Sequence, residues 1–108
     1  MDENLKRIKE IILQTAKEMN IEIDKIILFG SRARGDYRED SDYDLLIVTK
    51  EKLIKQKEIE LEIKIRNRIA LETKIACDIF FVDKKTFERY KNVYGSLYGI
   101  ANLEGVMI

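Results

Sequence analysis

Residues 25–48 of the chain read KIILFGSRARGDYREDSDYDLLIV. The stretch opens with an apolar, β-branched run that Gly30 ends, and this predicts a buried strand over residues 25–29. A second apolar run covers residues 45–48, and because it is continuous rather than alternating, we expect both faces of its strand to be covered. The glycine, serine and charged residues of 30–41 predict a loop between the two strands.

Apolar periodicity outside this stretch predicts helices. Residues 3–19 carry apolar side chains at helical spacing, and Asp2 or Asn4 is suited to cap that helix. Residues 51–75 fit both an alternating strand and a helix, and their length favours the helix because strands seldom exceed about ten residues. The remaining expected elements are a strand over 79–82, a helix over 84–93 capped by Asp83, and a last helix from Ser96 to near Gly105.

The order of these elements predicts an α/β (α+β) fold in which a small mixed sheet of three or four strands is flanked by helices. The chain has 108 residues, with no repeat and no linker-like stretch, so we expect one domain over residues 1–108. The apolar residues 106–108 are expected to dock on this domain or to meet a partner.

Composition excludes several function classes. Twenty basic and twenty acidic residues give no net charge, so the broad positive field of a protein that grips long nucleic acid is not expected. With one cysteine and no histidine, the chain cannot form an internal disulfide, a His/Cys zinc site or a histidine-activated nucleophile. Any metal must bind to oxygen, which favours magnesium, manganese or calcium. No apolar run approaches the ~18 residues of a membrane span, and a cytoplasmic protein is expected.

Three carboxylates occupy the beginnings of predicted strands. Asp42 and Asp44 precede the apolar run of the second strand, and Asp78 precedes that of the third. Because strand side chains alternate, Asp42 and Asp44 project from one face about 6.6 Å apart along the chain. If the third strand lies nearby, Asp78 joins them, and the three charges would repel each other unless cations neutralise them. A two-metal centre for phosphoryl attack fits this set.

Gly30 and Ser31 follow the first strand directly. Glycine at that point allows backbone amides to approach a phosphate closely, and the serine adds a hydroxyl group. We therefore expect a phosphate cradle beside the carboxylates, as transfer from a magnesium-bound triphosphate requires.

Other motifs compete for the same segment. Gly30 and Gly35 have the spacing of a P-loop, but Asp36 follows where that motif needs lysine. An EF-hand loop would need glycine where Leu45 opens an apolar strand. A third interpretation is a solvated acidic loop with Asp78 as an edge charge, which explains the carboxylates singly but not their coincidence with the glycine-serine turn.

These residues resemble a known family. Gly30-Ser31, ten residues and then Asp42-Tyr43-Asp44 are similar to the GS-x10-D-x-D signature of the DNA polymerase β nucleotidyltransferase superfamily. The fuller string over residues 30–48 looks like its minimal branch, the MntA-type nucleotidyltransferases encoded beside HEPN-domain partners. Residues 77–79 and 103–106 also resemble that branch, so the likeness covers essentially the whole chain.

The resemblance implies site roles. Asp42 and Asp44 would bind two Mg²⁺ ions, with Mn²⁺ as the alternative metal. Asp78 would complete one metal site and help to deprotonate the attacking hydroxyl group. Gly30 and Ser31 would hold the distal phosphates of ATP.

The resemblance also implies a partner. In this branch the enzyme is the antitoxin of a toxin-antitoxin pair and silences a HEPN ribonuclease toxin by adding AMP to one of its tyrosines. A chain of this length lacks the helical domain that binds the acceptor in larger members, so the acceptor surface would come from another chain in a hetero-oligomer. The apolar side chains available for this contact, or for packing on the chain's own sheet, are Tyr94, Leu97, Tyr98, Ile100 and Leu103.

Further expectations stay open. Arg32 and Arg34 lie in the same turn as Gly30 and would contact phosphate or acceptor, or else remain solvated charges. Two other functions also stay open: nucleotidyl transfer to a small molecule with a helical partner subunit, and a binding module that masks the toxin without catalysis.

Overall fold

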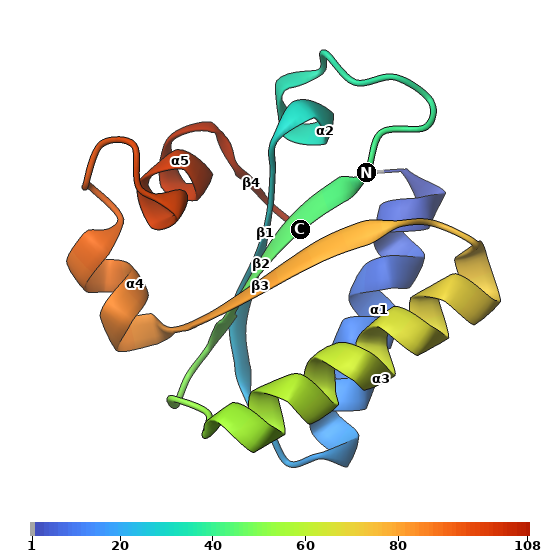
Figure 1. Ribbon diagram of the computed structural model, residues 1–108, viewed down its shortest axis with the longest axis horizontal. Helices are drawn as coiled ribbons and strands as arrows, with labels where there is room; N and C mark the ends of the chain where they lie inside the picture. The colour runs from blue at the N-terminus through green and yellow to red at the C-terminus, as the bar shows by residue number, and fades with distance from the viewer. Residues whose placement is uncertain (1) are drawn as a thin grey trace.

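The computed structural model describes residues 2–108, and its helices and strands follow the predicted order (Figure 1). In chain order the elements are α1 (Glu3–Glu18), β1 (Ile23–Phe29), α2 (Ser31–Arg34), β2 (Tyr43–Thr49), α3 (Lys55–Thr73), β3 (Cys77–Asp83), α4 (Lys84–Tyr90), α5 (Leu97–Glu104) and β4 (Val106–Met107). The ambiguous segment 51–75 is thus a helix, as its length predicted.

The four strands form one mixed sheet in the order β3-β2-β1-β4. β1 is antiparallel to both β2 and β4, whereas β2 and β3 are parallel because α3 carries the chain back between them. This arrangement confirms the predicted mixed sheet flanked by helices. It also brings the end of β1 and the beginnings of β2 and β3 to one edge of the sheet.

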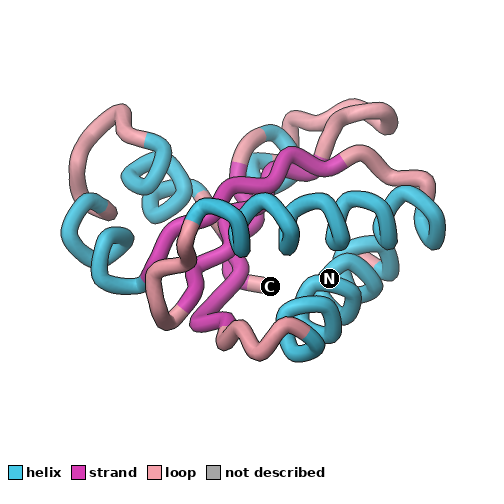
Figure 2. The backbone as a smooth tube through the Cα atoms, turned by 60° about the horizontal axis from the view of Figure 1, so that its bottom comes forward, coloured by secondary structure: helices cyan, strands magenta, loops and turns pink. Residues whose placement is uncertain are grey.

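The helices cover the two faces of the sheet in pairs. Figures 1 and 2 show α1 and α3 on one side of the strands and α4 and α5 on the other. Leu45 and Ile47 of β2 pack in the core under α1 and α3, while Leu46 and Val48 pack with residues of α4 and α5. Both faces are therefore covered, which explains why the apolar run of β2 is continuous.

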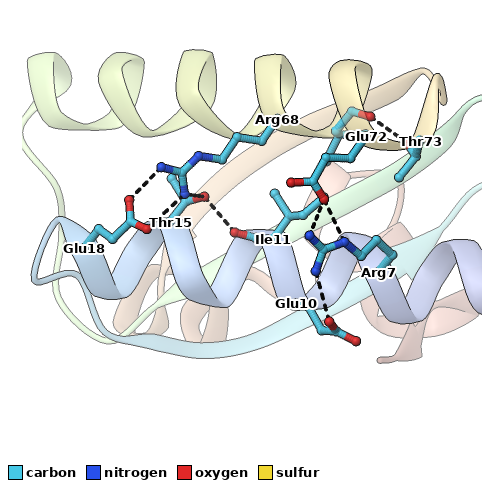
Figure 3. A network of polar contacts seen from close by, with 9 residues as sticks. Arg7, Glu10, Ile11, Thr15, Glu18, Arg68, Glu72 and Thr73 are labelled. Atoms are coloured by element: carbon cyan, nitrogen blue, oxygen red, sulfur yellow. Dashed lines mark hydrogen bonds and ion pairs between the residues drawn. The ribbon is translucent and has the colours of Figure 1, made fainter.

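Polar contacts join α1 to α3 near both ends of their interface (Figure 3). Arg68 on α3 donates to Glu18 at 2.7 Å and to the hydroxyl group of Thr15 at 3.0 Å. Towards the other end, Arg7 of α1 binds Glu72 of α3. Such exposed pairs contribute at most about 1 kcal/mol each, so they align the helices while the apolar core supplies most of the stability.

The helix caps follow the sequence predictions. Asp2 accepts a hydrogen bond from the Leu5 amide at 2.6 Å, which settles the first cap in favour of Asp2. Asp83 accepts from the Thr86 amide at 3.0 Å, and Ser96 accepts from the Gly99 amide at 2.9 Å. Each cap satisfies an amide that has no partner inside the helix, so the helix starts are fixed locally.

The three predicted strands each begin two residues earlier than expected, and two further differences concern the loop after β1 and the end of α4. Residues 30–41 are not all loop, because α2 forms one helical turn between Gly30 and Gly35, both of which have positive φ (74° and 89°). Gly35 ends that turn in the left-handed conformation, a common role of glycine after a helix. The helix expected over residues 84–93 ends at Tyr90.

The C-terminal residues dock on the domain, one of the two predicted outcomes. β4 pairs with β1, the Ile108 amide donates to the Ile26 carbonyl at 3.0 Å, and the Ile108 side chain packs against the core. The preceding apolar residues divide between two environments. Leu97 and Tyr98 pack on the sheet, whereas Tyr94 and Leu103 stay 95% and 81% exposed. None of the helices within residues 2–108 combines the length and apolarity that crossing a membrane requires.

Candidate functional site

The predicted carboxylates lie at the edge where β1 ends and β2 and β3 begin. In the strand register Asp44 faces Phe29 of β1 on one side and Asp78 of β3 on the other. Because side chains alternate along β2, Asp44 projects to the α4/α5 face with Leu46. Asp42 precedes Asp44 by two residues and is exposed. We refer to Asp42, Asp44 and Asp78 as the carboxylate cluster.

The charges of the carboxylate cluster interact. The pKa of Asp44 is raised above its ordinary value of 3.8, first by partial burial and then by the charge of Asp78, a side-chain hydrogen bond with Asp78 and the charge of Asp42. The positive charge of Arg34 acts in the opposite direction. The negative charge of Asp44 is therefore unfavourable in the folded chain, and binding of a proton or a cation would reduce this free-energy cost.

Gly30 allows the Asp44 carboxylate to lie directly against the turn after β1. A Cβ atom at position 30 would collide with the carboxylate oxygen of Asp44, and the φ of 74° is itself unfavourable for other residues. The sequence predicted glycine here for its close approach to phosphate. The structure gives a second reason, which is the close approach of a carboxylate from β2.

The predicted phosphate turn is a single helical turn, with Ser31 as its first residue. The Gly30 carbonyl accepts from the amides of Ala33 and Arg34, while the Gly30 amide donates to Oε1 of Glu104 at 3.1 Å. Glu104 is a site residue that reasoning from the sequence did not identify. Its only signal was its place in the closing segment, residues 103–106, that resembles the minimal branch.

Arg32 faces its own loop. Its Nε and Nη2 atoms donate to the Ser41 carbonyl at 3.2 and 3.0 Å, and Nη2 also donates to the Glu39 carbonyl at 2.9 Å. The guanidinium group lies 4.3 Å from the ring centre of Tyr37 and 4.4 Å from that of Tyr43. These bonds hold the loop that leads into Asp42, and a contact of Arg32 with phosphate or acceptor stays a prediction.

Arg34 lies on the other side of the turn. It pairs with Glu104 at 3.0 Å and with Asp36 at 3.3 Å. Its charge also acts on Asp44. Arg34 is thus a cation close to the carboxylate cluster, and Glu104 helps to hold it there.

A hollow of about 280 Å³ lies beside Asp42 and Asp78 and extends to the end of α3 and to Cys77. Burial raises the pKa of the Cys77 thiol to about 11, so the thiol remains protonated at neutral pH. Cys77 therefore supplies no nucleophile here. A larger hollow of about 400 Å³ lies between the end of α4 and α5 and shares no residue with the carboxylate cluster.

The side chains of the carboxylate cluster suit a hard cation in their chemistry. They offer oxygen ligands only, which Mg²⁺ and Mn²⁺ prefer, and a cation would offset both the burial of Asp44 and the repulsion from Asp78 and Asp42 that raise its pKa. Across residues 2–108, no three Asp, Glu, Cys or His side chains already converge closely enough to hold a metal. The two-ion site on Asp42, Asp44 and Asp78 therefore stays a prediction.

The chain is similar in sequence to known nucleotidyltransferases. The family model described as "Polymerase beta, Nucleotidyltransferase" matches residues 6–96. Two proteins of Methanocaldococcus jannaschii, both named "Putative protein adenylyltransferase", are similar in sequence. The first is 45% identical over 67 residues, which are 58% of this chain and 67% of the relative. The second is 56% identical over 43 residues, which are 40% of this chain and only 43% of the relative.

A solved structure agrees with the fold. The crystal structure named "putative nucleotidyltransferase from Sulfolobus solfataricus" superposes with a TM-score of 0.54 at 24% sequence identity. The superposition covers 96% of this chain and 80% of that one. At this identity the likeness concerns the fold alone.

Proposed function

We propose, from the premise that this chain belongs to the polymerase β nucleotidyltransferase family, that it transfers AMP from ATP to a hydroxyl group of a partner protein. The observation that carries the proposal is the register of β2 and β3, which sets Asp44 beside Asp78 next to the Gly30–Ser31 turn. The two Methanocaldococcus relatives named as protein adenylyltransferases support a protein as the acceptor.

In this proposal each part of the site has a chemical role. Asp42, Asp44 and Asp78 would hold two Mg²⁺ ions, whose chemistry is to neutralise phosphate charge and to favour the ionised form of the attacking hydroxyl group. Asp78, which is exposed at the beginning of β3, would accept the proton of that hydroxyl group. The new bond joins the acceptor oxygen to the α-phosphorus, and the bond to the β-phosphate breaks to release pyrophosphate.

The turn after β1 would bind the distal phosphates. Ser31 is the first residue of α2 and follows Gly30, against which the Asp44 carboxylate lies. A phosphate there would lie between backbone donors of the turn after β1 and metal ligands at the beginning of β2. Binding and activation of the triphosphate would thus share one edge of the sheet.

The proposed partner is a HEPN ribonuclease toxin that is modified on a tyrosine, with this chain as its cytoplasmic antitoxin. The structure supports a protein partner through its exposed apolar side chains. Tyr94 and Leu103 are 95% and 81% exposed beside the hollow between α4 and α5. They line that hollow together with Val93 and Ile100, and apolar side chains gathered on one surface mark protein–protein contacts.

The test uses the full chain, labelled ATP, magnesium and a purified HEPN-domain partner. We expect label on the partner, and loss of labelling by roughly 10²-fold or more in an Asp42→Ala/Asp44→Ala variant, because the charge stabilisation of the transition state is removed. Asp40→Ala is the matched control, since Asp40 is an exposed aspartate of the same loop. Circular dichroism checks that each variant keeps its fold.

The outcomes separate the candidate functions. Tight binding without labelling would favour a module that masks the toxin. Labelling of a small molecule instead of the partner would favour nucleotidyl transfer to a small molecule. Persistent transfer by the double variant would overturn the assignment of the site.

A further inference from the structure

Glu104 binds both ends of α2, the helical turn that follows β1. Its Oε1 atom accepts hydrogen bonds from the Gly30 amide at 3.1 Å and from Nη1 of Arg34 at 3.0 Å. Gly30 precedes α2 and Arg34 ends it, so one carboxylate fixes both ends of this single helical turn. The Glu104 side chain is 24% exposed, so solvent competes with these bonds only in part.

The C-terminal strand determines this position. β4 pairs with β1 so that Val106 faces Leu28, and continuing the antiparallel register by two residues sets Glu104 opposite Gly30. Gly105 allows the close approach, because a Cβ atom there would collide with the Ala101 carbonyl and with the Ile27 side chain. The pairing of β4 with β1 thus places the Glu104 carboxylate beside the turn that follows β1.

Gly30 is held from two sides. Glu104 binds its amide, and the Asp44 carboxylate lies where a Cβ atom would be. A displacement of the turn would therefore change the surroundings of Asp44 as well as the position of Ser31. Loss of Glu104 would also leave Arg34, the cation whose charge acts on Asp44, paired with Asp36 alone.

We propose that Glu104 is a positioning residue: it holds the Gly30–Ser31 turn and Arg34 in place beside the carboxylate cluster, so that the phosphates of a magnesium-bound nucleoside triphosphate meet a turn whose backbone is already ordered. This inference rests on the proposed function and adds to it that β4 and the end of α5 belong to the architecture of the active site.

The experiment compares Glu104→Ala and Glu104→Gln with the unmodified chain. Removing the side chain is expected to raise the Kd for Mg-ATP on the order of 10- to 100-fold, the range seen when a group that orients binding residues is lost. Glutamine keeps an acceptor oxygen for the Gly30 amide and Arg34, so we expect its Kd to rise by less than about fivefold. Glu22→Ala is the matched control, because Glu22 is an exposed glutamate paired with Lys50 away from the site.

Two measurements accompany the titration. Hydrogen exchange at the Gly30 amide is expected to become faster in Glu104→Ala and to change little in Glu104→Gln, since the bond to Oε1 protects that amide. Thermal unfolding shows whether the variants keep their stability, which a change in positioning alone leaves nearly unaltered.

The results distinguish this inference from the proposed function. If the unmodified chain does not bind Mg-ATP, the proposed function fails. If it binds and Glu104→Ala binds equally well, the role of Glu104 is wrong. If both variants lose affinity in proportion to a fall in Tm, Glu104 is a structural residue and the positioning role is again wrong.

Discussion

The two faces of the sheet differ in how completely they are covered. Under α1 and α3, Ile8, Ile12 and Ile65 are fully buried, and the ion pairs of Figure 3 join the two helices above them. Under α4 and α5 the core is smaller, and Phe80 of β3 remains 39% exposed next to the row that holds Asp44 and Asp78. The same strands therefore build a closed face for stability and a partly open face for chemistry.

Alternation along β2 makes this division feasible. Leu45 and Ile47 point to the closed face, whereas Asp44 and Leu46 point to the open one. A carboxylate at position 45 would be desolvated in the core, at a cost of several kcal/mol without a partner. Asp44 is only partly desolvated, so it can keep a charge and remain accessible to a cation.

The largest effect is expected on the closed face. Leu45→Ala should lower the free energy of unfolding by about 2–5 kcal/mol, because it removes a fully buried side chain and leaves a cavity. Leu103→Ala, an exposed leucine on α5, should change it by less than about 0.5 kcal/mol. Urea denaturation of both variants measures the difference. Equal losses would mean that the two faces do not differ in the way described.

The next effect concerns the loop that leads to the carboxylate cluster. Arg32→Ala removes hydrogen bonds to two carbonyls and the stacking on Tyr37 and Tyr43, and should cost about 1–2 kcal/mol of stability. Arg32→Lys keeps the charge but not the planar fork, so it should recover less than half of the loss. Hydrogen exchange over residues 35–42 and denaturation provide the measurement. A Kd for Mg-ATP that rises while stability stays unchanged would show that Arg32 binds phosphate after all.

Much of this architecture follows from local patterns. Periodicity predicted the helices and strands, and the two-residue spacing of Asp42 and Asp44 predicted that they share a face. The pairing of Asp44 with Asp78 required only that β3 lie beside β2, whereas a shared metal site that includes Asp42 stays a prediction. Patterns of this kind depend on neighbours within a few residues, so one sequence is enough to reveal them.

The features that the sequence did not predict depend on distant contacts. Glu104 lies 74 positions from Gly30 in the sequence and reaches it because β4 pairs with β1. β4 consists of two exposed residues, and so short a segment gives no strand pattern in the sequence. The orientation of Arg32 depends on the path of the loop back to Ser41. The turn α2 was missed because four residues between two glycines carry no helical periodicity.

The smallest expected effect tests the open face directly. The pKa of Asp44 is raised in the folded chain above its ordinary value of 3.8, so its favourable contribution is fully present below that pH and is lost as the pH rises through the folded pKa. Asp44→Asn should therefore raise Tm slightly at pH 7 without divalent cations, and the gain should vanish near pH 4. Magnesium should reduce the gain, because it stabilises only the chain that keeps the carboxylate. Asp40→Asn, at an exposed position of the same loop, is the control in the same thermal scans. A lower Tm of Asp44→Asn at neutral pH would mean that other groups of the fold stabilise the charge of Asp44. The open face would then carry no destabilising charge that a cation could neutralise.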